Sequence, residues 1–126
     1  KCGAGNDTVG TQGDVVPTIM GRLGGEFRQQ CWGRDLLTLP EGDKGAGVIK
    51  PSGSDQTVAI ISGDHLLVQP KDMPAKVWQY RLGTNPEAKV VTNPQVEAEL
   101  KQKLESFLQT ATKSLLDNTA GVEDPK

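Results

Sequence analysis

Asp64 and His65 are the neighbouring side chains that come nearest to a catalytic or metal-binding pair in this sequence. His65 is the single histidine, so a Ser–His–Asp or Cys–His arrangement would have to pass through it. A carboxylate and an imidazole also suit a metal ion, but two ligands are too few, and adjacent strand residues point to opposite faces. Because Gly63-Asp64 lies between two apolar stretches, we interpret it as a tight β-turn, with a metal site at Asp64 and His65 as the alternative.

The two cysteines, Cys2 and Cys31, are far apart in the sequence and show no C-x-x-C spacing. That spacing disfavours a redox or zinc motif. We expect a disulfide between them, worth about 3.5 kcal/mol through loop entropy; two free, buried thiols in a cytosolic protein are the alternative. A disulfide favours an extracytoplasmic location, although Lys1-Cys-Gly-Ala-Gly5 lacks the apolar segment of a signal peptide.

Length and charge exclude several classes of protein. The chain has 126 residues, with 14 Lys+Arg against 16 Asp+Glu and a formal net charge of −2. Without a cluster of basic residues, nucleic acid is not an expected partner. No apolar run approaches the roughly 20 residues that span a bilayer, so we expect no membrane contact by this chain. The length suits a single domain.

The remaining polar and aromatic residues offer little chemistry. Trp32, Trp78 and Tyr80 could stack on a sugar, but with aromatics at only 4% of residues they are expected to anchor the core. The glycine-rich segments do not match a phosphate-binding pattern, and the acidic residues show no spacing that would pair two carboxylates. The sequence therefore predicts no catalytic residue and no cofactor held by this chain.

Hydrophobic periodicity predicts the elements that would position these residues. Helices are expected at residues 14–23 and 95–117, and strands at 47–50, 56–62, 65–69 and 76–82. The fold class is α+β: a small antiparallel sheet of three to four strands packs against a long C-terminal helix, with a short N-terminal helix. Residues 1–13 are expected to be flexible, 14–117 to form the single domain, and 118–126 to be a disordered tail.

Each helix has a recognisable start and an apolar face. Asp14 is expected to cap the short helix, which would be buried through Val16, Ile19, Met20 and Leu23. Asn93 is expected to cap the long helix, with Pro94 at its first position. The apolar stripe of the long helix should pack on the sheet; it comprises Val96, Leu100, Leu104, Phe107, Leu108, Ala111 and Leu115.

Three segments resemble motifs of the sulfatases within the alkaline phosphatase superfamily. Asp14-Val-Val-Pro-Thr-Ile-Met20 resembles the "D-I-x-P-T-L-L" helix start, and Trp32-Gly-Arg-Asp-Leu-Leu37 resembles the "G-R-S/D-L-L" element that follows it. Further on, Trp78-Gln-Tyr-Arg-Leu-Gly-Thr-Asn-Pro-Glu87 is similar to the "E-L-Y-D-L-x-x-D-P-x-E" turn before the closing helix. The order and spacing match the small C-terminal subdomain, and the branch looks closest to lipoteichoic acid synthase-like phosphoglycerol transferases and membrane-anchored sulfatases.

The resemblance implies the non-catalytic C-terminal portion of an exported sulfatase or phosphoglycerol-transferase-like enzyme. In that family, a divalent metal and a Thr, Ser or formylglycine nucleophile lie upstream of the "D-x-x-P-T" helix, and Asp64-His65 comes after it, in the wrong order. This chain would brace an upstream catalytic domain of the same polypeptide, with Arg34 and Lys50 at the edge of its substrate cleft. The alternative is an autonomous extracytoplasmic glycan- or protein-binding module that uses Trp32, Trp78 or Tyr80.

Overall fold

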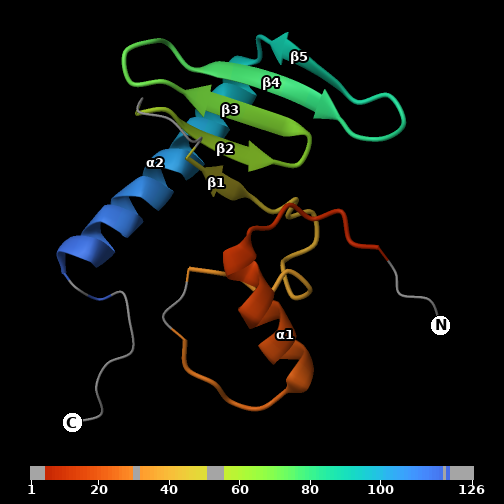
Figure 1. The fold of residues 1–126 in the computed structure, drawn as a ribbon, viewed down its shortest axis with the longest axis vertical. Helices are drawn as coiled ribbons and strands as arrows, with labels where there is room; N and C mark the ends of the chain where they lie inside the picture. The colour runs from red at the N-terminus through yellow and green to blue at the C-terminus, as the bar shows by residue number, and fades with distance from the viewer. Residues whose placement is uncertain (1–4, 30–31, 51–55, 118, 120–126) are drawn as a thin grey trace.

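A five-stranded antiparallel sheet with one long helix across it forms the larger part of the structure (Figure 1). The computed structural model describes residues 5–29, 32–50, 56–117 and 119. The sheet order follows the chain, and each strand pairs with the next. The elements in order are the 3-10 turn η1 (Gln12–Asp14), α1 (Val15–Leu23), β1 (Gly47–Ile49), β2 (Val58–Ser62), β3 (His65–Gln69), β4 (Lys76–Arg81), β5 (Glu87–Val91) and α2 (Pro94–Leu116).

The predicted α+β class is confirmed, but the prediction of three to four strands is wrong because the sheet has five. The missed strand is β5, which pairs with β4 from Arg81↔Glu87 to Val77↔Val91. Four of its five residues are exposed, as expected at the edge of a sheet, so its sequence lacks the alternation that marks a half-buried strand. The tight turn predicted at Gly63-Asp64 is confirmed, since Ser62 pairs with His65 on either side of it.

The core lies between one face of the sheet and α2. Cross-strand register aligns one apolar residue from each strand, in the row Val48–Ile60–Leu67–Val77–Val91. Leu100 and Leu104 of α2 pack against the buried members of this row, while α2 contacts β2 and β3. Burial of these aliphatic side chains is the main stabilising contribution that the fold provides.

The long helix begins as predicted but extends beyond its partner. Asn93 caps it by accepting a hydrogen bond from the Val96 amide at 3.3 Å, and Pro94 occupies the first turn. The stripe is buried at Leu100 and Leu104, but the second half of α2 projects past the sheet (Figure 1). The last apolar residues of the predicted stripe are therefore exposed: Phe107, Leu108 and Leu115.

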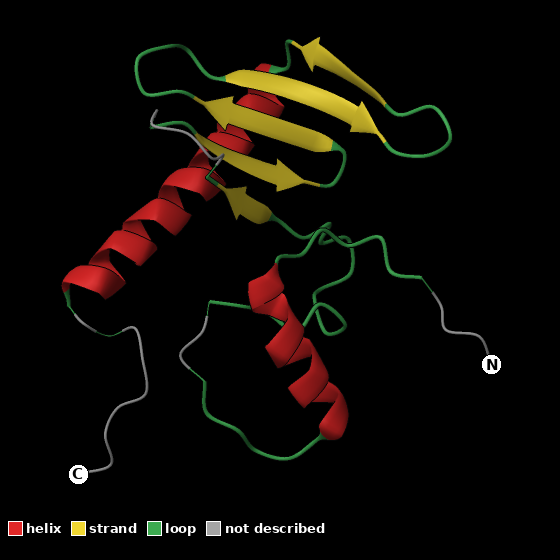
Figure 2. Cartoon of the chain, in the orientation of Figure 1, coloured by secondary structure: helices red, strands yellow, loops and turns green. Residues whose placement is uncertain are grey.

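The short helix forms where predicted, but its predicted burial is wrong. In α1, every residue of which is described, Pro17 is the buried one, and Val16, Ile19 and Leu23 are 61%, 53% and 74% exposed. Between α1 and β1, the described residues form neither helix nor strand (Figure 2). Within this stretch, Gly45 makes an isolated parallel bridge with Val9. Except for Thr119, the predicted tail at 118–126 lies outside the described residues. Within the described part, no helix is long and apolar enough to cross a membrane.

Candidate functional site

Asp14 is the centre of a polar junction between the N-terminal segment and the sheet. Its Oδ2 accepts hydrogen bonds from the Thr11 amide at 2.7 Å and the Thr11 hydroxyl at 3.1 Å, which makes Asp14 the third residue of a capping box that begins η1 at Thr11. Asp14 is also the N-cap residue of α1, as predicted, but its side chain makes no cap hydrogen bond to that helix. Its Oδ1 accepts one from the Arg34 amide at 2.7 Å. The Arg34 guanidinium lies 3.5 Å from the same oxygen and donates through Nη2 to the Ala46 carbonyl at 2.7 Å, next to β1.

Thr18 makes a second connection between the same two segments. Its hydroxyl donates to the Asp14 carbonyl at 2.7 Å and accepts from the Leu36 amide at 3.1 Å. Gly33 lies so close to Gly13 that a Cβ on Gly33 would overlap the Gly13 carbonyl oxygen. We call Thr11, Asp14, Thr18, Gly33 and Arg34 the Asp14 junction; it joins the "D-x-x-P-T" and "G-R-D-L-L" segments.

The Asp14 carboxylate is held in its charged form although its side chain is almost fully buried. Burial by itself raises the pKa of Asp14, because desolvation disfavours the charge. Hydrogen bonds from the Thr11 and Arg34 amides and side chains outweigh burial and bring the pKa below its ordinary value of 3.8. A satisfied, ionised carboxylate of this kind stabilises structure and is not poised to exchange a proton near neutral pH.

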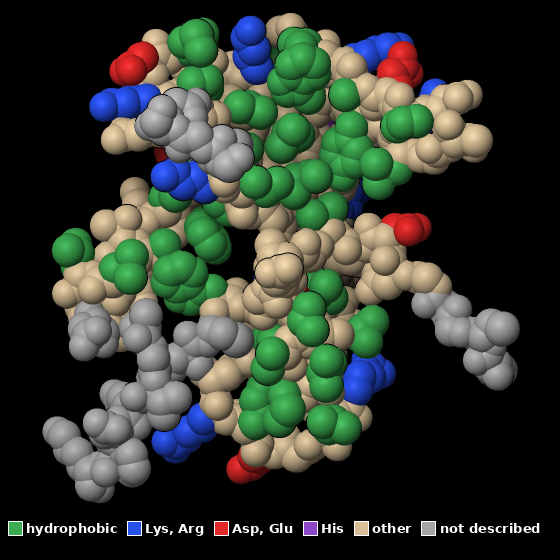
Figure 3. Space-filling model, viewed as in Figure 1, with side chains coloured by type: hydrophobic (Ala, Val, Ile, Leu, Met, Phe, Trp, Pro, Cys, Tyr) green, Lys and Arg blue, Asp and Glu red, His purple; other side chains and the backbone are tan. Residues whose placement is uncertain are grey.

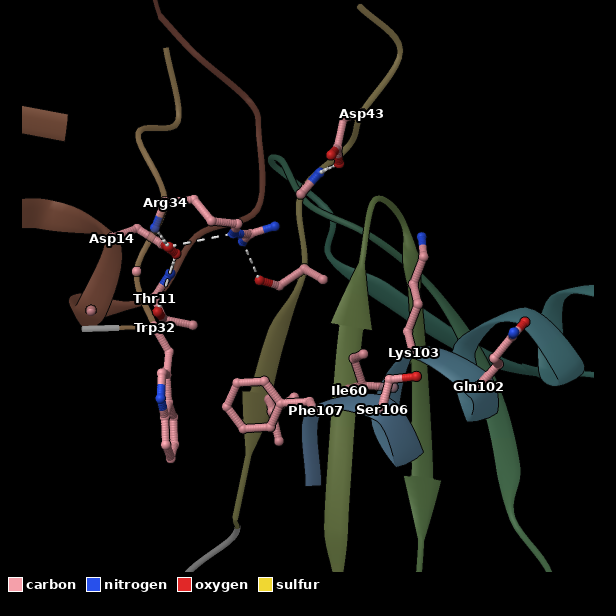
Figure 4. A pocket seen from close by; sticks show the side chains of 15 residues that line it. Thr11, Asp14, Trp32, Arg34, Asp43, Ile60, Gln102, Lys103, Ser106 and Phe107 are labelled. Atoms are coloured by element: carbon pink, nitrogen blue, oxygen red, sulfur yellow. Dashed lines mark hydrogen bonds and ion pairs between the residues drawn. The ribbon is translucent and has the colours of Figure 1, made fainter. Parts of the chain in front are cut away.

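A cavity of about 750 Å³ lies beside the Asp14 junction, between it and α2 (Figure 4). Trp32 and Phe107 contact each other edge to face there, with ring centroids 5.7 Å apart at an angle of 87°. The cavity is visible in Figure 3 as a hollow between the sheet and the α1 segment. Its lining combines aliphatic, aromatic and polar side chains: Thr11, Asp14, Trp32, Arg34, Asp43, Ala46, Val48, Ile60, Gln102, Lys103, Ser106 and Phe107.

The structure brings Asp64 and His65 together at the β2–β3 turn. Asp64 Oδ1 lies 2.8 Å from His65 Nδ1, and Asp64 Oδ2 accepts from Gln79 at 2.9 Å. The Gln79 hydrogen bond is the largest influence on the pKa of Asp64, which lies below its ordinary value. The Tyr80 amide donates to the Asp64 carbonyl at 2.9 Å, and its hydroxyl donates to Gly63. These contacts fix the hairpin against β4.

This turn does not form a metal centre or a hydrolytic triad. Over the described residues, no group of three or more His, Cys, Asp and Glu side chains could hold a metal ion. The divalent metal that the resemblance implies therefore does not fit the described part of this chain. Ser62, which pairs with His65 across the turn, donates its hydroxyl to the Gly45 carbonyl at 2.6 Å, so it is not activated as a nucleophile.

The face of the sheet opposite α2 carries an apolar groove of about 660 Å³. Trp78 and Tyr80, two residues apart on β4, lie side by side in it with Leu66 and Leu82. Figure 3 views this face, and hydrophobic side chains gather over the strands. Trp32, Trp78 and Tyr80 were expected to anchor the core, and none of them belongs to the buried cluster. The register places Trp78 and Tyr80 on the other face of the sheet from Val77, and Trp32 is 47% exposed.

The other predicted site residues are separated. Arg34 belongs to the Asp14 junction and lines the cavity, whereas Lys50 follows β1 and is exposed. Cys2 and Cys31, and with them the predicted disulfide, lie outside the described residues. Gln102, Ser106 and Phe107 were not predicted to form a cavity wall, because helical spacing alone does not reveal that α2 extends past the sheet.

Comparisons with known proteins give no family for this chain. No protein-family model matches it, and neither a curated protein nor a solved structure does.

Proposed function

We propose that this chain is the non-catalytic C-terminal portion of an exported sulfatase or phosphoglycerol-transferase-like enzyme. It braces an upstream catalytic domain of the same polypeptide on the outer side of the membrane. The upstream domain carries the divalent metal and the nucleophile for sulfate or phosphate ester chemistry, and this chain supplies neither.

The exposed apolar face of α1 is the observation that carries the proposal. Val15, Val16, Ile19 and Leu23 lie on consecutive turns and are each more than half exposed. Apolar side chains gathered on one face of a helix are typical of a buried contact, and nothing among the described residues covers them. The resemblance places the catalytic domain just before this helix, so α1 is where that domain would pack.

The Asp14 junction also supports a structural role for the two N-terminal motifs. Asp14, Thr18 and Arg34 direct their hydrogen bonds to one another and to backbone groups. These structural hydrogen bonds are sufficient to explain why the two motifs contain these residue types, and no catalytic role is needed. The "D-x-x-P-T" and "G-R-D-L-L" patterns are then the two halves of one tertiary contact.

The reading frame immediately upstream of Lys1 tests the proposal directly. We expect several hundred further codons that encode a Thr, Ser or Cys nucleophile and an Asp-His metal pair. A stop codon or an unrelated domain directly before Lys1 would refute the proposal. The chain alone, supplied with Mn²⁺ or Mg²⁺, should not hydrolyse p-nitrophenyl sulfate or p-nitrophenyl phosphate.

An autonomous extracytoplasmic glycan- or protein-binding module is the second candidate. The apolar groove with Trp78 and Tyr80 on the open sheet face favours it, since an exposed apolar patch of this kind is typical of an interaction site. In that case Trp78→Ala would abolish partner binding while the free energy of unfolding changes little. An upstream catalytic domain would exclude this candidate.

A further inference from the structure

We propose that the cavity lined by Trp32 and Phe107, between the Asp14 junction and α2, is a binding site for a neutral sugar. This site goes beyond the proposed function and does not rest on it, because its lining belongs wholly to this chain. The cavity volume of about 750 Å³ falls within the range of roughly 300–1,000 Å³ that small-molecule sites occupy. Three features of the lining indicate a neutral sugar: its aromatic rings, its polar side chains and its charges.

The aromatic wall provides a surface on which an apolar ring face can stack. Trp32 is 47% exposed and Phe107 is 38% exposed, which is unusual for two of the few aromatic residues in the chain. Their rings are close to perpendicular, so the pair itself uses at most one ring face. Ring surface therefore remains for stacking in the cavity, whose lining also includes the aliphatic side chains of Val48 and Ile60.

A sugar also needs hydrogen-bond partners for its hydroxyl groups, and polar side chains in the cavity lining can provide them. Gln102 and Ser106 lie one turn apart on α2, and their side chains have no hydrogen-bond partner among the described residues. Asp43 accepts from the Gly45 amide through Oδ1 at 2.8 Å, and its second oxygen is an acceptor for a ligand hydroxyl. Figure 4 shows Ser106 and Gln102 along α2 beside Phe107, and Asp43 on the loop before β1.

The charges in the lining are balanced, which favours an uncharged ligand. Asp14 and Arg34 lie together in the junction, and Lys103 forms an ion pair with Glu99 at 2.9 Å. Within the lining itself, the charge of Asp43 offsets that of Lys103, so its two carboxylates and two cations cancel. A ligand with an apolar ring face, several hydroxyl groups and no net charge satisfies all three conditions, and a pyranose sugar has these properties.

Titration of the full chain with neutral tetrasaccharides tests the site. We would use cellotetraose, maltotetraose and N-acetylchitotetraose, followed by isothermal titration calorimetry and tryptophan fluorescence. At least one should bind saturably and change the fluorescence of a Trp78→Phe variant, in which Trp32 is the remaining tryptophan. Failure of all three to bind would overturn the proposal, as would tighter binding of a sulfated heparin tetrasaccharide.

Substitutions in the wall then locate the site. Trp32→Ala should weaken binding about tenfold or more through lost stacking, and Gln102→Ala about fivefold through a lost hydrogen bond. Gln109→Ala, also on an exposed part of α2 but outside this cavity, is the matched control and should bind like the wild type. Thermal melting verifies folding; should Trp32→Ala not fold, Gln102→Ala decides. Unchanged affinity in Gln102→Ala and Trp32→Ala would place binding elsewhere and refute the site.

Discussion

Asp14 Oδ1 accepts a hydrogen bond from the Arg34 amide at 2.7 Å, and this contact joins two segments that are twenty positions apart. The Arg34 side chain continues the connection to the Ala46 carbonyl at the start of the sheet. A parallel bridge between Val9 and Gly45, with the Val9 amide donating to Lys44 at 2.9 Å, runs beside it. Because α1 buries little apolar surface, these polar contacts are what hold it against the rest of the chain.

Asp14→Asn should lower the free energy of unfolding by about 2–3 kcal/mol, the cost of losing hydrogen bonds to a charged acceptor. The two carboxylate oxygens accept hydrogen bonds from the Thr11 and Arg34 amides. In the asparagine variant, one oxygen is replaced by an NH₂ group, which is itself a donor and cannot accept one of these hydrogen bonds. Urea unfolding measures the change, and Asp72→Asn, an exposed carboxylate, is the matched control. If both variants stay within about 0.5 kcal/mol of the wild type, Asp14 does not stabilise the fold.

Gly33→Ala should destabilise the chain by about 3 kcal/mol, at the upper end for an overpacked site. The added methyl group would overlap the Gly13 carbonyl oxygen, and backbone atoms cannot rotate away from it. Gly5→Ala is the control, because no atom of a described residue other than its chain neighbours lies within 4 Å of the position that its Cβ would occupy. Equal melting temperatures for the two variants would show that residues 13 and 33 do not approach closely in solution.

Stability should fall in acid partly through Asp14. Its pKa in the folded chain lies below the ordinary 3.8, so its stabilising contribution is complete above that value and is lost as the pH falls through the folded-state pKa. The difference in unfolding free energy between wild type and Asp14→Asn should therefore shrink from pH 6 to pH 3. A difference that stays constant over this range would mean that folding does not lower the pKa of Asp14.

The sequence predicted the elements that carry a clear local signal. It did not predict the features that depend on tertiary contacts. The β2–β3 hairpin and the start of α2 follow from local signals at Gly63, Asn93 and Pro94, and all three are confirmed. β5 was missed because it is an exposed edge strand. The face on which Trp78 lies depends on the register of the whole sheet and on where α2 crosses it, and local periodicity contains neither.

The same holds for the candidate sites: the sequence indicated some of their residues but not the tertiary contacts between them. Pro17 and Thr18 were recognised as part of a motif, but the hydrogen bond from the Leu36 amide to Thr18 could not be read from spacing. The alternation argument placed Asp64 and His65 on opposite faces, yet Asp64 lies in the turn, outside the strand, and reaches His65. The cavity depends on how far α2 extends beyond β2, which is a matter of tertiary geometry.

Zinc and manganese should show no stoichiometric binding at Asp64 and His65. Asp64 already accepts from Gln79 and contacts His65, and no third ligand of the usual kinds joins them in the described part of the chain. Isothermal titration of the wild type and of His65→Ala with each metal should give indistinguishable, flat profiles. One-to-one uptake that disappears in His65→Ala would contradict this structure of the turn.

The chain alone should self-associate weakly through α1. Val16, Ile19 and Leu23 present apolar surface to water, and two copies can bury it against each other. Leu23→Lys places a charge in that surface, so the rise of sedimentation coefficient with concentration that we expect for the wild type should be absent in this variant. Gln56→Lys adds the same charge at an exposed site away from α1 and should leave the association unchanged. A wild-type coefficient that does not depend on concentration would show that the α1 face is too small to drive contact, and the case for an upstream domain packed on it would weaken accordingly.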